Sequence, residues 1–282
     1  MGEDLSNPAI RKFVEDSRFI YEAWKEADIN GFQTNILDCG AGQILFQTPI
    51  AKYLEPFWTP ILRHFEKTRR IITYERREST SQYMHAWDRA KDMLAVMDHL
   101  EITRCDIVSH SSGAVASLHF ALMYPERVRS IVLMNVAAFY PKLRGPIAVL
   151  SDKLAPLLPD AIVLPLFLTF LAKRGTEDYA LHRYAFGKFK PLGLHLKYSL
   201  NHITQEHDLR ESLCAIRCPV LLINRTDDAV VPMEDMVYLH DRLPRCFGLH
   251  TVAGGGHMFH YRHAGDIIGF MEGFYRRISK EN

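Results

Sequence analysis

The sequence predicts an α/β fold, with a mostly parallel central sheet, helices on both faces of that sheet and a helical cap insertion. Strand-like segments alternate with helical segments, most of these strands are apolar at every position, and the alternation stops between residues 137 and 210. Strands without a polar face need cover on both sides, as in parallel sheets. We therefore expect residues 1–136 and 211–282 to form the core and residues 137–210 to form a cap over it.

The N-terminal half of the predicted core begins with a helix. Apolar residues recur at helical spacing from Pro8 to Asp28, and Asn30-Gly31 ends this pattern. Two short strands, at residues 32–38 and 43–47, are joined by Cys39-Gly40-Ala41-Gly42, whose composition favours a hairpin or turn. The elements expected next are a helix at 58–67, a strand at 70–74 and an amphipathic helix at 87–100.

The middle of the chain shows a strand, a turn, a helix and a second strand with almost no loop between them. The first strand is expected at residues 105–108, the helix at 114–124 and the second strand at 130–134, with SHSSG as the turn. Residues 137–210 are rich in Leu, Phe and Pro and are predicted to be mostly helical, without a strand. The alternation then returns with strands at 220–223 and 248–252 and helices at 233–241 and 265–278.

Composition excludes several classes of protein. The 282 residues carry 34 basic and 33 acidic side chains, for a net charge of +1, and no long basic run, so no nucleic-acid partner is expected. The five cysteines are an odd number in a long chain, which favours reduced thiols in the cytoplasm. Residues 1–13 lack the apolar core of a secretory signal, and prolines interrupt the most apolar stretch, 154–172. We therefore expect a cytoplasmic protein without stable membrane insertion.

The segment Ser109-His110-Ser111-Ser112-Gly113 lies directly between a buried strand and a helix. A nucleophile at such a sharp turn needs small neighbours, because its own backbone is strained. The N-terminal N–H groups of the following helix, with that of Ser112 first, point toward a developing oxyanion. The pattern indicates Ser111 as a nucleophile.

A serine hydroxyl needs a base to remove its proton and a carboxylate to orient that base. A buried strand ends in a polar turn with Asp227 and Asp228, and a later strand ends in three glycines followed by His257. The order Ser, Asp, His is expected when the partners come from later strand ends. His257, His260 and His263 are three residues apart, but no acidic or thiolate residue accompanies them, so no metal is expected.

With these motifs, residues 32–277 resemble the α/β-hydrolase superfamily, in the branch of single-domain esterases, thioesterases and carbon–carbon hydrolases with a helical cap. The matching pieces are SHSSG, YPERVRSIVLMN, RTDDAVVP and GGGH before a terminal helix. The resemblance implies that Asp228, four residues before Pro232, is the acid, and that Asp227 only forms the turn. It implies an acyl-enzyme, since relatives that form an alkyl ester carry aspartate at the position of Ser111.

Two segments depart from the pattern of this superfamily. Relatives usually have His-Gly after the strand at 43–47, where a second oxyanion N–H arises, whereas this chain has Gln47-Thr48-Pro49-Ile50. Pro49 has no N–H to donate, and a shift of one residue makes Ile50 the donor. Relatives also have a glycine-bearing turn where this chain has residues 75–79, so that Arg76 or Arg77 could point toward the site.

We therefore expect a serine hydrolase that cleaves an apolar ester or thioester without a metal or organic cofactor. A carbon–carbon hydrolase, an acyltransferase and a non-catalytic ligand-binding protein are the alternatives, and the sequence leaves open whether the chain forms a homodimer. Aromatic and leucine-rich residues of the insertion, including Tyr140, Leu164 and Phe170, form either the core of the cap or the wall of the site. The residues expected to contact substrate are Thr48, His110, Phe139, Phe167, Tyr184 and Met258.

Overall fold

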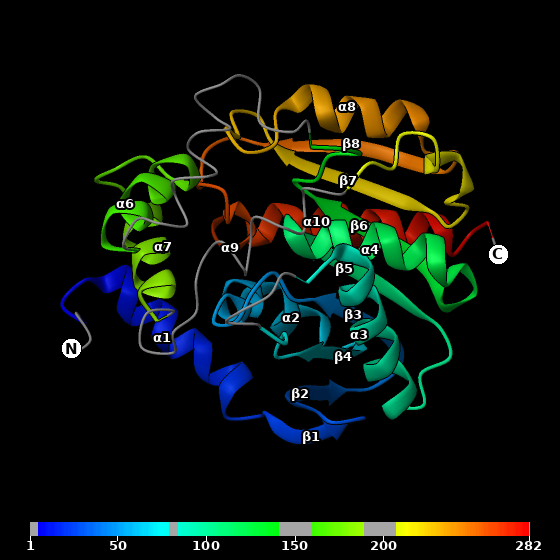
Figure 1. Ribbon diagram of the computed structural model, residues 1–282, viewed down its shortest axis with the longest axis horizontal. Coiled ribbons are helices and arrows are strands. Elements are labelled where there is room, and N and C mark those ends of the chain that lie inside the picture. Colours follow the sequence, from blue (N-terminus) through cyan, green and yellow to red (C-terminus); the bar gives the residue numbers. More distant parts are fainter. Residues whose placement is uncertain (1–4, 79–83, 141–159, 189–206, 282) are drawn as a thin grey trace.

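The computed structural model describes residues 5–78, 84–140, 160–188 and 207–281. These residues form an eight-stranded sheet in the order β1-β2-β4-β3-β5-β6-β7-β8, flanked by helices (Figure 1). The last six strands in this order are parallel to one another, and β2 pairs antiparallel with both β1 and β4. The predicted α/β class is therefore confirmed.

The bounds of the elements follow the predicted segments in most of the chain. The strands are β1 Lys25–Ile29, β2 Phe32–Gly40, β3 Gln43–Thr48, β4 Arg69–Tyr74, β5 Cys105–His110, β6 Val128–Met134, β7 Val220–Arg225 and β8 Cys246–Val252. The helices are α1 Pro8–Tyr21, α2 Thr59–Phe65, α3 Ala86–His99, α4 Ser112–Met123, α6 Asp160–Leu171, α7 Glu177–Gly187, α8 Met233–Arg242, α9 Phe259–Arg262 and α10 Ala264–Ile278.

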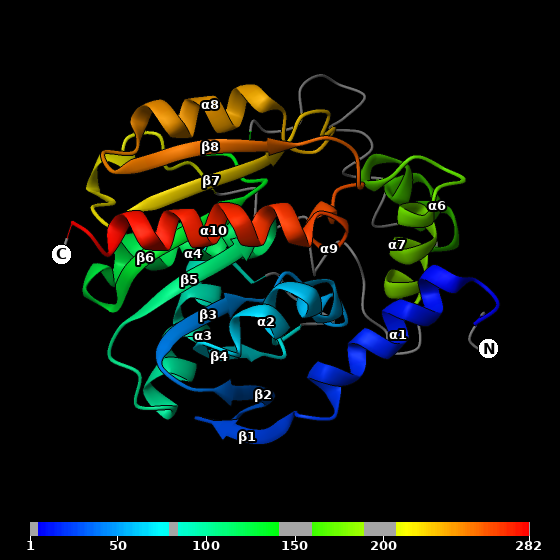
Figure 2. The same cartoon turned by 180° about the vertical axis from the view of Figure 1, so that it is seen from behind.

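Both faces of the sheet are covered along its central strands, which explains why β5, β6 and β7 are buried at nearly every position. Along β5, Ile107 packs into the cluster formed with α3, α4 and α8, whereas its neighbour Val108 packs into the cluster formed with α2 and α10. Figures 1 and 2 show these helices on opposite faces. Each of these central strands therefore buries successive side chains in two different cores.

The N-terminal region differs from the prediction in two places. The first helix ends at Tyr21, and Lys25–Ile29 forms an edge strand whose exposed side chains carry little apolar signal. Asn30 and Gly31, with φ of 55° and 84°, form the hairpin turn to β2. Of the two alternatives predicted for residues 39–42, a hairpin or a turn, the structure has a turn, because β2 and β3 each pair with β4 instead of with one another. Gly40 is required there, since a Cβ would collide with the carbonyl of Arg69.

The described part of the predicted insertion is helical. It comprises α6 and α7, which pack with α1 and the short helix Glu55–Trp58 in a third apolar cluster. At its base, Phe139 and Asp208 form an isolated antiparallel bridge that brings both ends of the insertion together. Residues 141–159 and 189–206 of the predicted cap lie outside the described residues.

None of the helices in the described ranges combines the length and apolar character that a bilayer span requires. All five cysteines are free thiols.

Candidate active site

Ser111 lies in the turn between β5 and α4, in a strained backbone conformation. Its φ of 52° and ψ of −125° are rarely adopted by residues other than glycine. Its N–H donates to the Met134 carbonyl of β6 (2.9 Å), which ties the turn to the neighbouring strand. Gly113 follows because a Cβ at that position would lie 2.7 Å from the carbonyl oxygen of Thr48. The result is a partly exposed hydroxyl at the carboxyl end of the sheet.

The side chains of Ser111, His257 and Asp228 converge at this end of the sheet. Nε2 of His257 lies 2.9 Å from Oγ of Ser111, and Nδ1 of His257 lies 3.0 Å from Oδ2 of Asp228. They come from the segments that follow β5, β8 and β7, and the imidazole and carboxylate are buried. Both distances suit proton transfer from a hydroxyl to a base held by a carboxylate.

Both oxygens of Asp228 are occupied by hydrogen-bond donors. Oδ1 accepts the N–H groups of Val230 and Val231 at 2.8 Å, and Oδ2 accepts Nδ2 of Asn135 at 2.8 Å. Burial raises the pKa of this carboxyl, but His257 and the two backbone amides lower it more, so the pKa lies below its ordinary value. Asp227, by contrast, is exposed and lies beside Arg225. The geometry therefore favours an ionised Asp228 that orients the imidazole.

The loop that carries His257 is held by the insertion. Gly254, Gly255 and Gly256 all have positive φ, and a Cβ on Gly256 would lie 3.0 Å from the Leu171 carbonyl oxygen at the end of α6. That carbonyl accepts the N–H of His257 at 2.5 Å. Nε2 of His182 in α7 accepts the N–H of Met258 at 3.3 Å. The position of the imidazole therefore depends on α6 and α7.

Three further histidines surround His257 and are buried in their neutral form. The ring of His110 lies 4.8 Å from that of His257 and 4.7 Å from that of His260. Burial lowers the pKa of His182 to about 4 and lowers that of His110 and His260 well below its ordinary value. His110 therefore packs beneath the nucleophile, and the neighbourhood of the imidazole carries few charges.

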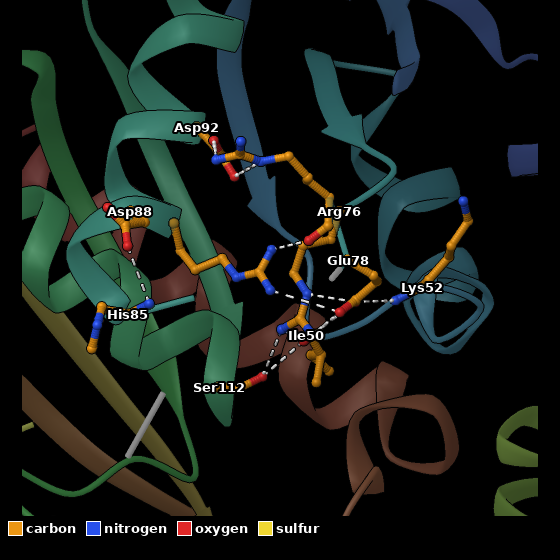
Figure 3. A network of polar contacts seen from close by, with 10 residues as sticks. Ile50, Lys52, Arg76, Glu78, His85, Asp88, Asp92 and Ser112 are labelled. Carbon is orange, nitrogen blue, oxygen red and sulfur yellow. Dashed lines mark hydrogen bonds and ion pairs between the residues drawn. The ribbon is translucent and has the colours of Figure 1, made fainter. Parts of the chain in front are cut away.

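The segment predicted to supply a second oxyanion donor is fixed against the start of α4 (Figure 3). Oγ of Ser112 donates to the Ile50 carbonyl at 2.8 Å. Nη1 of Arg76 also donates to this carbonyl and lies 3.5 Å from Oγ of Ser112. Because Pro49 has no N–H, Ile50 is the one of these two residues that can donate a backbone hydrogen bond to substrate.

The sequence left open whether Arg76 or Arg77 points toward the site, and the structure places Arg76 there as a buried cation. Its side chain is 2% exposed and is paired with Glu78 through Nε (2.8 Å) and Nη2 (3.0 Å). Arg77 pairs instead with Asp92, with 2.8 Å between Nη2 and Oδ1. Arg89 approaches the same Glu78, and burial together with Arg76 lowers its pKa to about 10. Arg76 is thus the arginine beside the site.

The residues predicted to contact substrate lie in different surroundings. Met258 is buried next to His257. Oγ1 of Thr48 lies 2.9 Å from Oγ of Ser117 in α4, so this side chain belongs to the core rather than to the site. Phe167 and Tyr184 are half-buried in the cluster of α1, α6 and α7. Phe139 stacks under Arg210, with 4.0 Å from the guanidinium carbon to the ring centre.

Asn135 is the main residue that the sequence reasoning missed. It follows β6 directly, has a positive φ of 47° and donates to Asp228, with Nδ2 also 3.4 Å from Nδ1 of His257. Its place directly after β6, the strand next to β5, was the signal in the sequence that could have indicated it.

No three His, Cys, Asp or Glu side chains among the described residues lie close enough together to hold a metal ion.

Comparison with known proteins places this geometry in a family. Residues 46–268 match the model of the alpha/beta hydrolase family. The chain is 31% identical to a Pseudomonas savastanoi protein named as a carbamate hydrolase (RutD), over 60% of this chain and 66% of that protein. It is 26% identical to the 2-hydroxymuconate semialdehyde hydrolase of Pseudomonas sp. CF600, over 86% of this chain and 90% of that enzyme.

Solved structures show the same fold. The enol-lactonase from Burkholderia xenovorans LB400 superposes with a TM-score of 0.74 at 18% identity, and the match covers 89% of this chain and 100% of the lactonase. The family match covers the nucleophile turn, the acid turn and the histidine loop. The chain therefore belongs to the alpha/beta hydrolase family.

Proposed function

We propose that the protein is a serine hydrolase that cleaves an apolar carboxylic ester or thioester through an acyl-enzyme on Ser111. The observation that carries the proposal is the hydrogen-bonded chain from Oγ of Ser111 through His257 to Asp228. A buried carboxylate and a partly exposed hydroxyl joined by one imidazole provide nucleophile, base and orienting acid.

In the first half of the reaction, Oγ of Ser111 forms a bond to the substrate carbonyl carbon while its proton passes to Nε2 of His257. Asp228 accepts Nδ1–H and stabilises the charged imidazole. The tetrahedral intermediate then collapses, the bond to the leaving group breaks, and the leaving group takes the proton from Nε2. The second half repeats these steps with water as the nucleophile, and Ser111 is released.

The oxyanion of both intermediates is proposed to bind the N–H groups of Ser112 and Ile50. Support comes from the contact between Oγ of Ser112 and the Ile50 carbonyl, which holds the two backbone segments together. Arg76 acts as a positioning residue, since it grips the same carbonyl from a buried site. An oxyanion donor of this kind contributes about a hundred- to a thousandfold in rate.

Hydrolysis of a carbon–carbon bond is the second candidate. It is favoured by the similarity to the 2-hydroxymuconate semialdehyde hydrolase, which extends over 86% of this chain. The same three side chains can serve this reaction, because the acyl group is again transferred from carbon to water. Carbamates should also be tested as substrates, because the chain is similar to a protein named as a carbamate hydrolase.

Reaction with a fluorophosphonate probe tests the proposal. The wild-type protein should form one adduct, located by mass spectrometry on Ser111, and Ser111→Ala should form none. Ser112→Ala, which keeps the neighbouring backbone N–H, is the matched control and should still be labelled. An unlabelled wild-type protein would overturn the assignment.

A panel of substrates then separates the two candidates. p-Nitrophenyl esters and acyl thioesters of increasing chain length report on the first, and a ring-opened dienoic semialdehyde reports on the second. Higher kcat/KM for the esters or thioesters than for the semialdehyde supports the proposed function. The reverse order would assign the protein to carbon–carbon bond hydrolysis.

A further inference from the structure

A cavity of about 260 Å³ lies at the end of the sheet opposite to Ser111. It is lined by Arg129 and Val128 at the start of β6, by residues that precede β5, β7 and β8, and by the ends of α4 and α10. Figures 1 and 2 show the C-terminus of α10 at this end, far from α6 and α7. Since β5 rises roughly 3.3 Å per residue, about 20 Å separates this cavity from Ser111.

Four arginines line the cavity: Arg104, Arg129, Arg217 and Arg245. They are far apart in the sequence, but each stands within three residues of the start of one of four neighbouring parallel strands. The amino ends of parallel strands meet at one edge of a sheet, so these four guanidinium groups are brought together. Arg104, Arg217 and Arg245 are exposed and Arg129 is half-buried, so the cluster presents positive charge to the solvent.

The carboxylates of the described residues do not balance these cations. Asp106 pairs with Arg129 through Nη2 at 2.5 Å and is also shared with Arg69 at 2.6 Å, so two guanidinium groups draw on one carboxylate. Glu281 pairs with Arg245 at 3.0 Å.

The other two arginines have no carboxylate partner among the described residues. Arg104 donates through Nε to the Val128 carbonyl at 3.3 Å. Arg217 makes no hydrogen bond or ion pair with any residue of the described ranges. Two guanidinium groups thus remain to bind an anion at this cavity, with a third only partly neutralised.

We propose that this cavity binds a small phosphate-bearing anion with more than one negative charge, such as a diphosphate. Arginine forks match the oxygens of phosphate groups and bind them through paired hydrogen bonds. The volume is below the usual range for sites of larger organic ligands, about 300–1,000 Å³, which restricts the ligand to a small molecule.

Inorganic pyrophosphate is the probe that tests this inference, with binding measured by isothermal titration calorimetry. We expect one site in the wild-type protein and at least a tenfold loss of affinity in Arg217→Glu. This variant removes no hydrogen bond or ion pair with a described residue, so its melting temperature without ligand should equal that of the wild type. Saturating pyrophosphate should raise the melting temperature of the wild type by roughly 2–5 °C.

Two comparisons guard against a general effect of charge. Arg11→Ala with Arg183→Ala changes the net charge by the same two units as Arg217→Glu, at exposed positions of α1 and α7. This double variant should bind pyrophosphate as the wild type does. Sulfate at matched ionic strength should bind at least tenfold more weakly than pyrophosphate.

Several results would overturn the inference. Absence of pyrophosphate binding in the wild type would show that the arginines only complement the carbonyl ends of α4 and α10. Equal affinity in Arg217→Glu and the wild type would place the anion elsewhere. Equal affinity for sulfate would reject phosphate as the ligand. Because none of these measurements uses catalysis, they stand whether or not the proposed function is correct.

Discussion

The two ends of the sheet each contain a carboxylate whose side chain is fully buried, and the two are neutralised in different ways. Asp106, at the amino ends of the strands, is bound by the guanidinium groups of Arg69 and Arg129 and by the hydroxyl of Ser130. Asp228, at the carboxyl ends, is bound by His257, Asn135 and two backbone amides, and Arg225 remains 3.6 Å away.

The different partners of Asp106 and Asp228 suit a structural role for the first and proton transfer for the second. A carboxylate paired with permanent cations stabilises the fold but leaves no proton to move. A carboxylate held mainly by neutral donors keeps its charge available to an imidazole, which can then accept a proton from Ser111. The neutral histidines around His257 add to this, because they place no competing positive charge beside it.

The largest expected effect comes from removing the charge of Asp228. Asp228→Asn retains the shape of the side chain but no longer fixes the Nδ1–H form of His257, so kcat on an ester substrate should fall about 10⁴-fold. Steady-state kinetics measure this, and urea unfolding should show that the fold is retained. A decrease of less than tenfold would mean that Asp228 is no more than a structural carboxylate, as Asp106 is.

Acid should destabilise the catalytic end of the sheet through its buried histidines. The pKa of His182 is lowered to about 4 by burial, and His110 and His260 are shifted in the same direction. Between the ordinary histidine pKa of about 6.5 and pH 4, the unfolded chain binds protons that the folded protein excludes. The free energy of unfolding is therefore highest above pH 6.5 and decreases as the pH falls.

Three such groups should lower the free energy of unfolding by about 4 kcal/mol between pH 7.5 and pH 5.5, and His119 and His207, whose pKa burial also lowers to about 4, add to this decrease. Urea titrations at the two pH values measure this, and in His260→Phe the decrease should be about 1.4 kcal/mol smaller. Equal unfolding free energies at both pH values would show that these histidines are protonated in the folded protein. The arginines of the opposite end stay charged throughout this range.

Removing the carboxylate at the other end should affect stability rather than chemistry. Asp106→Ala leaves Arg69 and Arg129 without their counter-charge and should lower the free energy of unfolding by about 3–5 kcal/mol. Asp98→Ala is the matched control, because that carboxylate is 57% exposed and pairs with Arg127; its cost should be at most about 1 kcal/mol. Equal costs in urea denaturation would remove the distinction between a buried and a surface pair.

The parts of the fold that could be predicted from the sequence are those where one strong local signal is enough. The apolar strand before Ser111, the small residues around it and the glycines before His257 specify their own conformations. The edge strand Lys25–Ile29 was missed because most of its side chains are exposed and give no apolar period. The chain direction after Gly40 depends on pairing with β4, a distant partner that no local pattern reveals.

The site shows the same division. The order of Ser111, Asp228 and His257 could be predicted because each follows a recognisable strand. The roles of Asn135, His182 and Arg76 depend on which strand ends and helices become neighbours in space. The four arginines of the opposite cavity escaped notice for this reason, since each is an isolated cation in the sequence and the cluster exists only in the folded sheet.

The smallest expected effect concerns Arg76, a buried cation near the catalytic end. Arg76→Met should lower kcat about 10- to 100-fold with little change in KM, because its guanidinium holds the Ile50 carbonyl and so fixes an oxyanion donor that acts in the transition state. Arg76→Lys should restore part of the rate, and Arg77→Met, which removes a cation that faces Asp92 instead, should leave kcat unchanged. Equal losses in Arg76→Met and Arg77→Met would indicate a general effect of charge and would reject the positioning role of Arg76.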